Sequence, residues 1–342
     1  MRDKPVLKGV GLFVLALVIA GLGCAPDAFE RAQRYEQAEQ YTQAEQVYQR
    51  IVTDQPGTDD ALKAQKQLTI LYIVSGREPE AQKAFTDLIA AFPTHKDTAA
   101  AIWAIAREFK KTGNPEKAIE LHQYNVEHFP KEKHAMWSQV EIIYYHIGAG
   151  DFTAAEAAVD KLLKVFAAEP TLSKEIYQVA QRYQKAGKIE KAPQLHQYNA
   201  EHFPADMYGM LSKVYHHLRN AEYTAADTPV NRLFTEFSTR PALAKEIYPL
   251  TGPLAKARKF DACVRLYKYF LEKEPKDDQA LFAQKGLALC YIELGDEVAA
   301  ERAIARLLSG FAGHKRIAQA VYELGMDCYR SRKFDRALDL HQ

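Results

Sequence analysis

Apolar residues recur three and four positions apart through most of the chain after residue 24, which places them on one face of successive helices. A small residue recurs on a longer ruler, at intervals of 37 residues with one interval of 34. Glycine often stands five residues before it, and proline often stands twelve residues after it. Because glycine and proline end helices, the pattern predicts a repeated unit of helix, short turn, helix and breaker. The small residues are Ala44, Ala81, Ala118, Ala155, Ala192, Ala226, Cys263, Ala300 and Ala337.

The repeats share a finer pattern once each is numbered from its own first residue. The small residue is position 20, a second packed residue follows at position 24, and proline often stands at position 32. Positions 4, 7, 8 and 11 of the first helix lie within about 100° of arc. In the third repeat they are held by Ile102, Ile105, Ala106 and Phe109. This pattern resembles the tetratricopeptide repeat, although the tryptophan that this family usually has at position 4 is absent.

The resemblance implies an all-α fold, a right-handed α-solenoid of about nine repeats that spans residues 25–342. The repeats start near residues 25, 62, 99, 136, 173, 207, 244, 281 and 318, and the last is incomplete. A block from Ala118 to Pro130 recurs almost unchanged two repeats later, from Ala192 to Pro204, so odd and even repeats differ in kind. The chain stops just as this block begins again at Ala337. We therefore expect either a truncated array or a final helix that frays.

Residues 1–24 have the pattern of a secretory signal peptide. Three cations among the first eight residues precede an uncharged run over residues 9–23. The run ends at Gly23 and Cys24, which resembles the cleavage motif of bacterial lipoproteins, and the resemblance implies a lipid on Cys24. It also implies an outer-membrane location facing the periplasm, because Ala25 and not aspartate follows the cysteine. The alternative is an uncleaved signal anchor over residues 9–26, which is shorter than the about 20 apolar residues of a spanning helix.

Charge and motifs narrow the function classes. The chain has 45 Lys and Arg against 44 Asp and Glu, a formal charge of +1, so it lacks the positive field that holds nucleic acid. It contains no phosphate-loop, dinucleotide-binding, serine-hydrolase or zinc-protease motif. We therefore expect no enzyme activity, no cofactor and no nucleic acid partner.

Histidine and cysteine positions indicate packing more than metal binding. His122 and His128 are six residues apart, whereas chelation from one helix uses residues three or four apart. Position 24 is expected to be packed, and three histidines occupy it: His122, His196 and His341. Three cysteines without metal-ligand spacing are interpreted as buried free thiols: Cys263, Cys290 and Cys328. We expect no metal site.

Aromatic residues gather on a second stripe of the first helices, at positions 2, 5 and 9, roughly 140° from the core stripe. A face that met only water would be polar. In the tetratricopeptide family the first helices line a concave wall where partners commonly bind, so the resemblance makes this stripe a candidate groove. The alternative is that the rings pack between neighbouring first helices. The candidate groove consists of Trp103, Arg107, Trp137, Tyr144, Tyr177, Tyr208, Tyr215, Tyr248, Phe282 and Tyr322.

We interpret the sequence as a non-enzymatic, lipid-anchored scaffold that binds other proteins or extended peptide segments in envelope assembly or trafficking. Tyrosine and tryptophan are enriched at binding hot spots, which favours this function. One rival is glycan or peptidoglycan binding, because rings also stack on sugars. A second rival is the non-catalytic N-terminal part of an enzyme whose catalytic domain lies beyond Gln342. The partner and the oligomeric state stay open.

Overall fold

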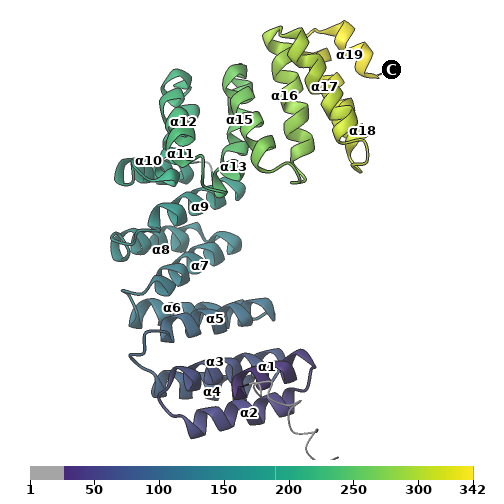
Figure 1. Ribbon diagram of the computed structural model, residues 1–342. Coiled ribbons are helices and arrows are strands. Elements are labelled where there is room, and N and C mark those ends of the chain that lie inside the picture. Colours follow the sequence, from purple (N-terminus) through teal and green to yellow (C-terminus); the bar gives the residue numbers. More distant parts are fainter. Residues whose placement is uncertain (1–26, 189, 342) are drawn as a thin grey trace, which may run out of the picture. The chain divides into compact units, whose positions relative to one another are not determined.

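The computed structural model describes residues 27–188 and 190–341, and every regular element in these ranges is a helix (Figure 1). The helices form nine successive pairs, which confirms the predicted all-α array of helix-turn-helix repeats. Cys24 and the signal sequence lie outside the described residues. None of the described helices is long and apolar enough to cross a membrane.

The chain forms two compact bodies. The N-terminal body consists of residues 27–146 and 152–166, and the C-terminal body consists of residues 147–151, 167–188 and 190–341. The first four helix pairs are α1 (Ala28–Gln37) with α2 (Tyr41–Asp54), α3 (Asp59–Val74) with α4 (Glu78–Ala91), α5 (Thr98–Lys111) with α6 (Pro115–His128), and α7 (Lys133–Ala149) with α8 (Phe152–Val165).

The remaining five pairs follow the same plan. They are α9 (Leu172–Lys185) with α10 (Lys191–His202), α11 (Met207–Arg219) with α12 (Tyr223–Phe237), the segments α13 (Ala242–Ile247), η1 (Tyr248–Leu250) and α14 (Thr251–Lys256) with α15 (Phe260–Lys273), α16 (Ala280–Leu294) with α17 (Glu297–Gly310), and α18 (Ile317–Arg330) with α19 (Phe334–His341). The seventh first helix is interrupted because Pro249 and Pro253 have no N–H to donate.

Each first helix ends in the same turn. Position 15 has a positive φ in all nine repeats, between 57° at Glu39 and 87° at Gly113. In eight of these repeats the next backbone N–H donates back to the carbonyl of position 11, as from Arg77 to Tyr72 at 2.8 Å. Glycine fits this left-handed conformation because it lacks a Cβ. The sequence identified the five glycine turns, whereas four repeats reach the same φ with Glu39, Ala221, Arg258 and Arg332.

The small residue at position 20 is buried in every repeat. Its exposure ranges from 0% at Ala44 to 4% at Ala337, because this face of the second helix lies against the first helix of its own pair. A small side chain lets the two helices approach closely. The period found in the sequence is therefore a packing period.

Position 4, where the tetratricopeptide family usually has tryptophan, is a buried glutamine in three even repeats. The side-chain amides of Gln65, Gln139 and Gln284 donate to backbone carbonyls on the paired second helix, over 2.8, 2.7 and 2.8 Å. The acceptors are the carbonyls of Ala84, Ala158 and Ala303, each at position 23. This bond fixes the register between the two helices of the pair.

The sixth repeat differs in length at the end of its first helix. α11 has 13 residues whereas α7 has 17, although both begin right after the repeated block. The one shortened interval between small residues therefore arises where α11 ends. The sequence pattern aligned Tyr208 with Trp137, and this alignment is wrong. Counted from the repeated block that precedes each helix, Tyr208 is equivalent to His134, and Leu211 is equivalent to Trp137.

Candidate interaction surface

Two tryptophans form the centre of the predicted stripe in the N-terminal body. The rings of Trp103 on α5 and Trp137 on α7 have centroids 5.5 Å apart at an angle of 46°. His134 lies 5.9 Å from the first ring and 4.9 Å from the second. The guanidinium of Arg107 stacks over Trp103 at 4.6 Å, and the ammonium of Lys133 lies over Trp137 at 4.8 Å. We call these five residues the tryptophan cluster.

Helical spacing places each tryptophan beside its cation. Arg107 follows Trp103 by four residues, and Lys133 precedes Trp137 by four, so each pair shares one helix face. The core side of α5 is filled by Ile102 and Ile105, which leaves Trp103 partly exposed at its edge. Both cations are exposed. The cluster therefore presents ring surface and positive charge together.

The C-terminal body places the equivalent residues differently. Tyr177 is completely buried, with Tyr208 5.4 Å and Tyr215 5.9 Å from it between ring centroids. Tyr208 is 9% exposed, and burial raises its pKa to about 12. Tyr215 stacks on His196 at 4.8 Å. For Tyr177 and Tyr208 the predicted place on an accessible groove is wrong, since these rings fill the space between neighbouring first helices.

The other candidates are spread over different surroundings. Tyr144 is partly buried on α7. Tyr248 packs against Phe270 with 4.8 Å between centroids, and Phe282 lies under the guanidinium of Arg316 at 4.4 Å. Tyr322 is 58% exposed. In the described residues, only the N-terminal body joins two of the predicted aromatics with two stacked cations.

A buried polar cluster recurs with the repeated block. Nδ1 of His122 lies 3.0 Å from the hydroxyl of Ser138, and Asn125 donates to that hydroxyl and to the carbonyl of Ala99, both at 3.0 Å. The second copy is built by His196, Asn199 and Ser212 with the carbonyl of Ser173. Burial lowers the pKa of both histidines to about 4. The predicted packing role of His122 and His196 is therefore confirmed, whereas His341 is exposed.

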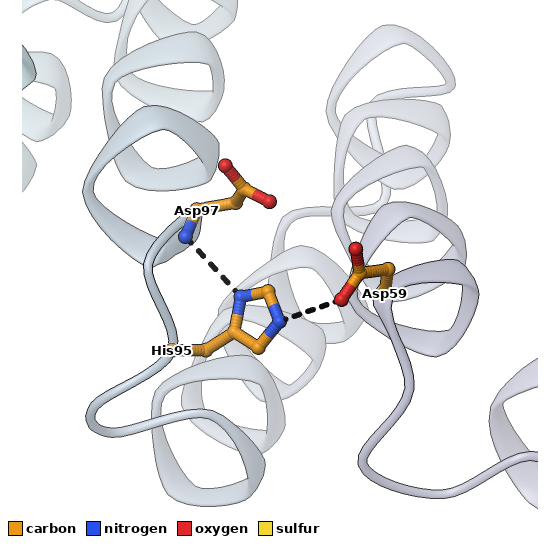
Figure 2. Close-up of side chains that lie close together, drawn as sticks. All are labelled: Asp59, His95 and Asp97. Carbon is orange, nitrogen blue, oxygen red and sulfur yellow. Dashed lines mark hydrogen bonds and ion pairs between the residues drawn. The ribbon is translucent and has the colours of Figure 1, made fainter.

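A cluster that the sequence did not indicate joins Asp59, His95 and Asp97 (Figure 2). The backbone N–H of Asp97 donates to Nδ1 of His95 at 3.2 Å, so Nε2 carries the proton and donates to Asp59 at 3.0 Å. This bond, with Lys96 nearby, lowers the pKa of the Asp59 carboxyl. The ligand atoms lie within 4.8 Å of one another, as a metal site would need.

The eighth repeat indicates that His95 has a structural role in the turn between repeats. The backbone N–H of Arg316 donates to Nδ1 of His314 at 3.2 Å, the same bond as that from Asp97 to His95. Arg316 thus stands at the place that Asp97 has in the other turn, and the guanidinium cation of arginine cannot be a metal ligand. The feature that both copies share is a histidine that accepts a bond from the start of the next first helix.

The three cysteines are buried and free, as predicted. Burial raises the pKa of Cys328 to about 11, and a hydrogen bond with Cys263 raises the pKa of Cys290. The raised pKa values keep the thiols of Cys290 and Cys328 protonated and unreactive.

Solved structures of tetratricopeptide repeat proteins are similar to this chain at low sequence identity. No protein-family model and no curated protein matches the chain. The C-terminal part of a tetratricopeptide repeat-containing protein from Cytophaga hutchinsonii is similar in structure, at 17% identity, over 75% of this chain and 98% of that one, with a TM-score of 0.44. A tetratricopeptide repeat protein from Parabacteroides merdae matches at 14% identity, over 77% and 97%, with a TM-score of 0.40. The fold is shown by the nine helix pairs of the described residues.

Proposed function

We propose that this chain is a non-enzymatic scaffold that binds segments of other proteins through the tryptophan cluster. The observation that carries the proposal is the pair of partly exposed tryptophans with a cation stacked on each. Tryptophan and arginine are the side chains most enriched at binding hot spots. Arg107 and Lys133 favour a partner segment of negative charge.

The chain contains its own comparison for this surface. The repeats that contain the second copy of the block and flank it have other residues at the equivalent positions, 74 residues further along the chain. Leu211 stands at the place of Trp137, Gln181 at that of Arg107, and Met207 at that of Lys133. That copy has lost both the cations and the ring exposure. If the tryptophans served only to pack the helices, the buried Tyr177 and Leu211 of the second copy would suffice. The presence of two tryptophans with cations therefore supports a binding role.

We further propose that the scaffold acts in the bacterial envelope, held by a lipid on Cys24 at the outer membrane and facing the periplasm, in assembly or trafficking of envelope proteins. This part of the proposal rests on residues 1–25 of the sequence. A glycan ligand fits the cluster less well, because sugar hydroxyls are usually bound by carboxylates or amides beside the ring, and here both tryptophans carry cations.

The test replaces Trp103 and Trp137 by alanine and, separately, the exposed Arg107 and Lys133 by glutamate. Proteins captured from periplasmic extract are identified by mass spectrometry, and peptides from them are titrated calorimetrically. We expect the tryptophan variant to bind about 1–3 kcal/mol more weakly, which is typical of aromatic anchors. The charge-reversal variant should lose affinity with an unchanged melting temperature.

The control is Tyr329→Ala, which removes a ring that is 58% exposed and lies outside the stripe. It should bind like the wild type. Unchanged binding by both cluster variants would refute the proposal. Release of the partner by soluble peptidoglycan fragments would favour the glycan function instead.

A further inference from the structure

Two cavities occupy equivalent places in the two bodies. One, of about 390 Å³, lies between α15, α16 and α17, and the other, of about 300 Å³, lies between α2, α3 and α4. Each is formed by the second helix of an odd repeat and both helices of the next repeat. Every residue that lines one cavity has its equivalent in the lining of the other, at the same offset along the chain that separates Gln284 from Gln65.

The two cavities have similar linings. Gln284 and its equivalent Gln65 hold the base through their bonds to the carbonyls of position 23. A leucine and a tyrosine also line both cavities at equivalent positions, Leu287 and Tyr291 in one and Leu68 and Tyr72 in the other. The lining of the cavity is therefore a product of the repeat, and the leucines in it suit an apolar side chain.

The rims of the two cavities carry opposite charge. Lys268, Arg302 and Arg306 line the first with Glu272, a formal charge of 3 − 1 = +2. The second has Lys83 with two acids, Glu80 and Asp87, a formal charge of 1 − 2 = −1. Its charges are also paired, Lys83 with Asp87 at 2.7 Å and Glu80 with Arg77 at 3.0 Å.

The cations of the first cavity are not paired in this way. Among the described residues, none of Lys268, Arg302 and Arg306 makes an ion pair, and all three are exposed. Lys268 lies over the ring of Tyr291 at 5.4 Å, and Glu272 pairs with Lys273. Three like charges around one apolar cavity repel one another, and a bound anion would relieve this repulsion.

We propose that the cavity between α15, α16 and α17 binds an acidic peptide segment that carries an apolar side chain. The apolar side chain enters between Leu271 and Leu287, and carboxylates on either side of it reach Lys268 on one helix and Arg302 and Arg306 on the other. Arginine holds carboxylates in a bidentate geometry, which gives direction as well as attraction. The site lies in the C-terminal body and is independent of the tryptophan cluster.

The test uses a fluorescein-labelled peptide in which one leucine is flanked on each side by two aspartates, with fluorescence anisotropy as the readout. Binding is expected to weaken at least about tenfold in the Arg302→Glu, Arg306→Glu variant, and to weaken with rising salt. The matched control is Lys161→Glu, Lys164→Glu, which makes the same charge change on the exposed side of α8. It should bind within about twofold of the wild type. Circular dichroism melts verify folding.

Three further arms distinguish the explanations: the tryptophan variant, a peptide without leucine, and phosphatidylglycerol vesicles in place of the peptide. The Trp103→Ala, Trp137→Ala variant should bind this peptide normally, so that failure of one site is separable from failure of the other. A peptide with serine in place of leucine should bind more weakly, and equal binding would overturn the proposal in favour of charge alone. Absence of peptide binding, equal loss in the control, or binding only to phosphatidylglycerol vesicles would also overturn it.

Discussion

At the scale of the residue, the turn between the paired helices stores backbone strain. Position 15 is left-handed in every repeat, and in four of them a residue with a Cβ holds that conformation. A non-glycine residue there costs roughly 1–2 kcal/mol. Ala221 is the simplest case, because its short side chain offers no polar contact in return.

We predict that Ala221→Gly stabilises the protein by about 0.5–1 kcal/mol, the relief of strain less the entropy that glycine adds to the unfolded chain. Urea denaturation measures it. The control is Gly187→Ala at the same position of the preceding repeat, where φ is 78° and an added Cβ meets nothing within 4 Å. That variant should be destabilised through the backbone alone, and a stability loss in Ala221→Gly would contradict the argument.

His122 and His196 should make stability depend on pH. Their pKa values are about 4 in the folded protein and near 6.5 in the unfolded chain, so the unfolded state binds protons first as the pH falls. Their contribution is fully present above about pH 6.5 and is lost as the pH falls toward 4, by up to about 3 kcal/mol for each histidine.

Urea midpoints measured between pH 7.5 and 4 check this prediction. The double variant His122→Gln, His196→Gln keeps a neutral polar side chain at each site and should show a flatter pH profile than the wild type. The charged neighbours of His122, which are Glu141 and Lys110, and the neighbour of His196, which is His216, are present in both proteins, so the difference between the two profiles isolates the two histidines. Parallel profiles would show that burial is not the cause.

At this scale, the sequence could predict the burial of a side chain only where that burial is decided by residues of the same repeat. The buried small residue at position 20 was predictable, because each pair packs against itself. The exposure of Trp103 and the burial of Tyr177 were not, because the difference lies in the next first helix, where Glu141 stands in one copy and Tyr215 in the other. The contact of His95 with Asp59 joins residues 36 positions apart in a turn without a motif.

At the scale of the element, the helix pair is the unit that the sequence specifies best. Helix boundaries follow from the turn at position 15 and from the proline and glycine breakers. The shortened end of α11 was misplaced because a shorter interval between small residues does not say where along the repeat the missing positions fall. The start of α11 right after the repeated block and the bonds of Ser212 in the buried polar cluster fix that register.

The seventh first helix offers an element-scale prediction. Pro253 lies exposed in α14 and cannot donate to the carbonyl of Pro249, which contributes to the break at η1. We expect Pro253→Ala to stabilise the protein by about 1 kcal/mol by restoring that bond. Urea denaturation checks it. Pro170→Ala, in an exposed turn, should be neutral or slightly destabilising, and the same result for both variants would refute the helix argument.

At the scale of the whole molecule, the proposed lipid on Cys24 would hold the chain at the membrane. We predict that Cys24→Ser abolishes lipid attachment, because the thiol is the acceptor of the lipid. The mature mass should lose the lipid increment, and the protein should move from the detergent phase to the aqueous phase in detergent partitioning. Cys263→Ser, a change to a buried thiol that lies far along the chain from the signal sequence, serves as the control. An unchanged mass in Cys24→Ser would favour the signal anchor.

The repeated block also sets a problem for folding. α6 and α10 present nearly the same surface, down to the histidine and asparagine that bind Ser138 and Ser212. During folding α6 and α10 therefore compete for the same partners, because either helix can dock at the position of the other and keep most of its hydrogen bonds. The near-identity that makes the array easy to extend by duplication also makes it easy to thread incorrectly. The native pairing then depends on chain connectivity, which brings each block to its own neighbour first.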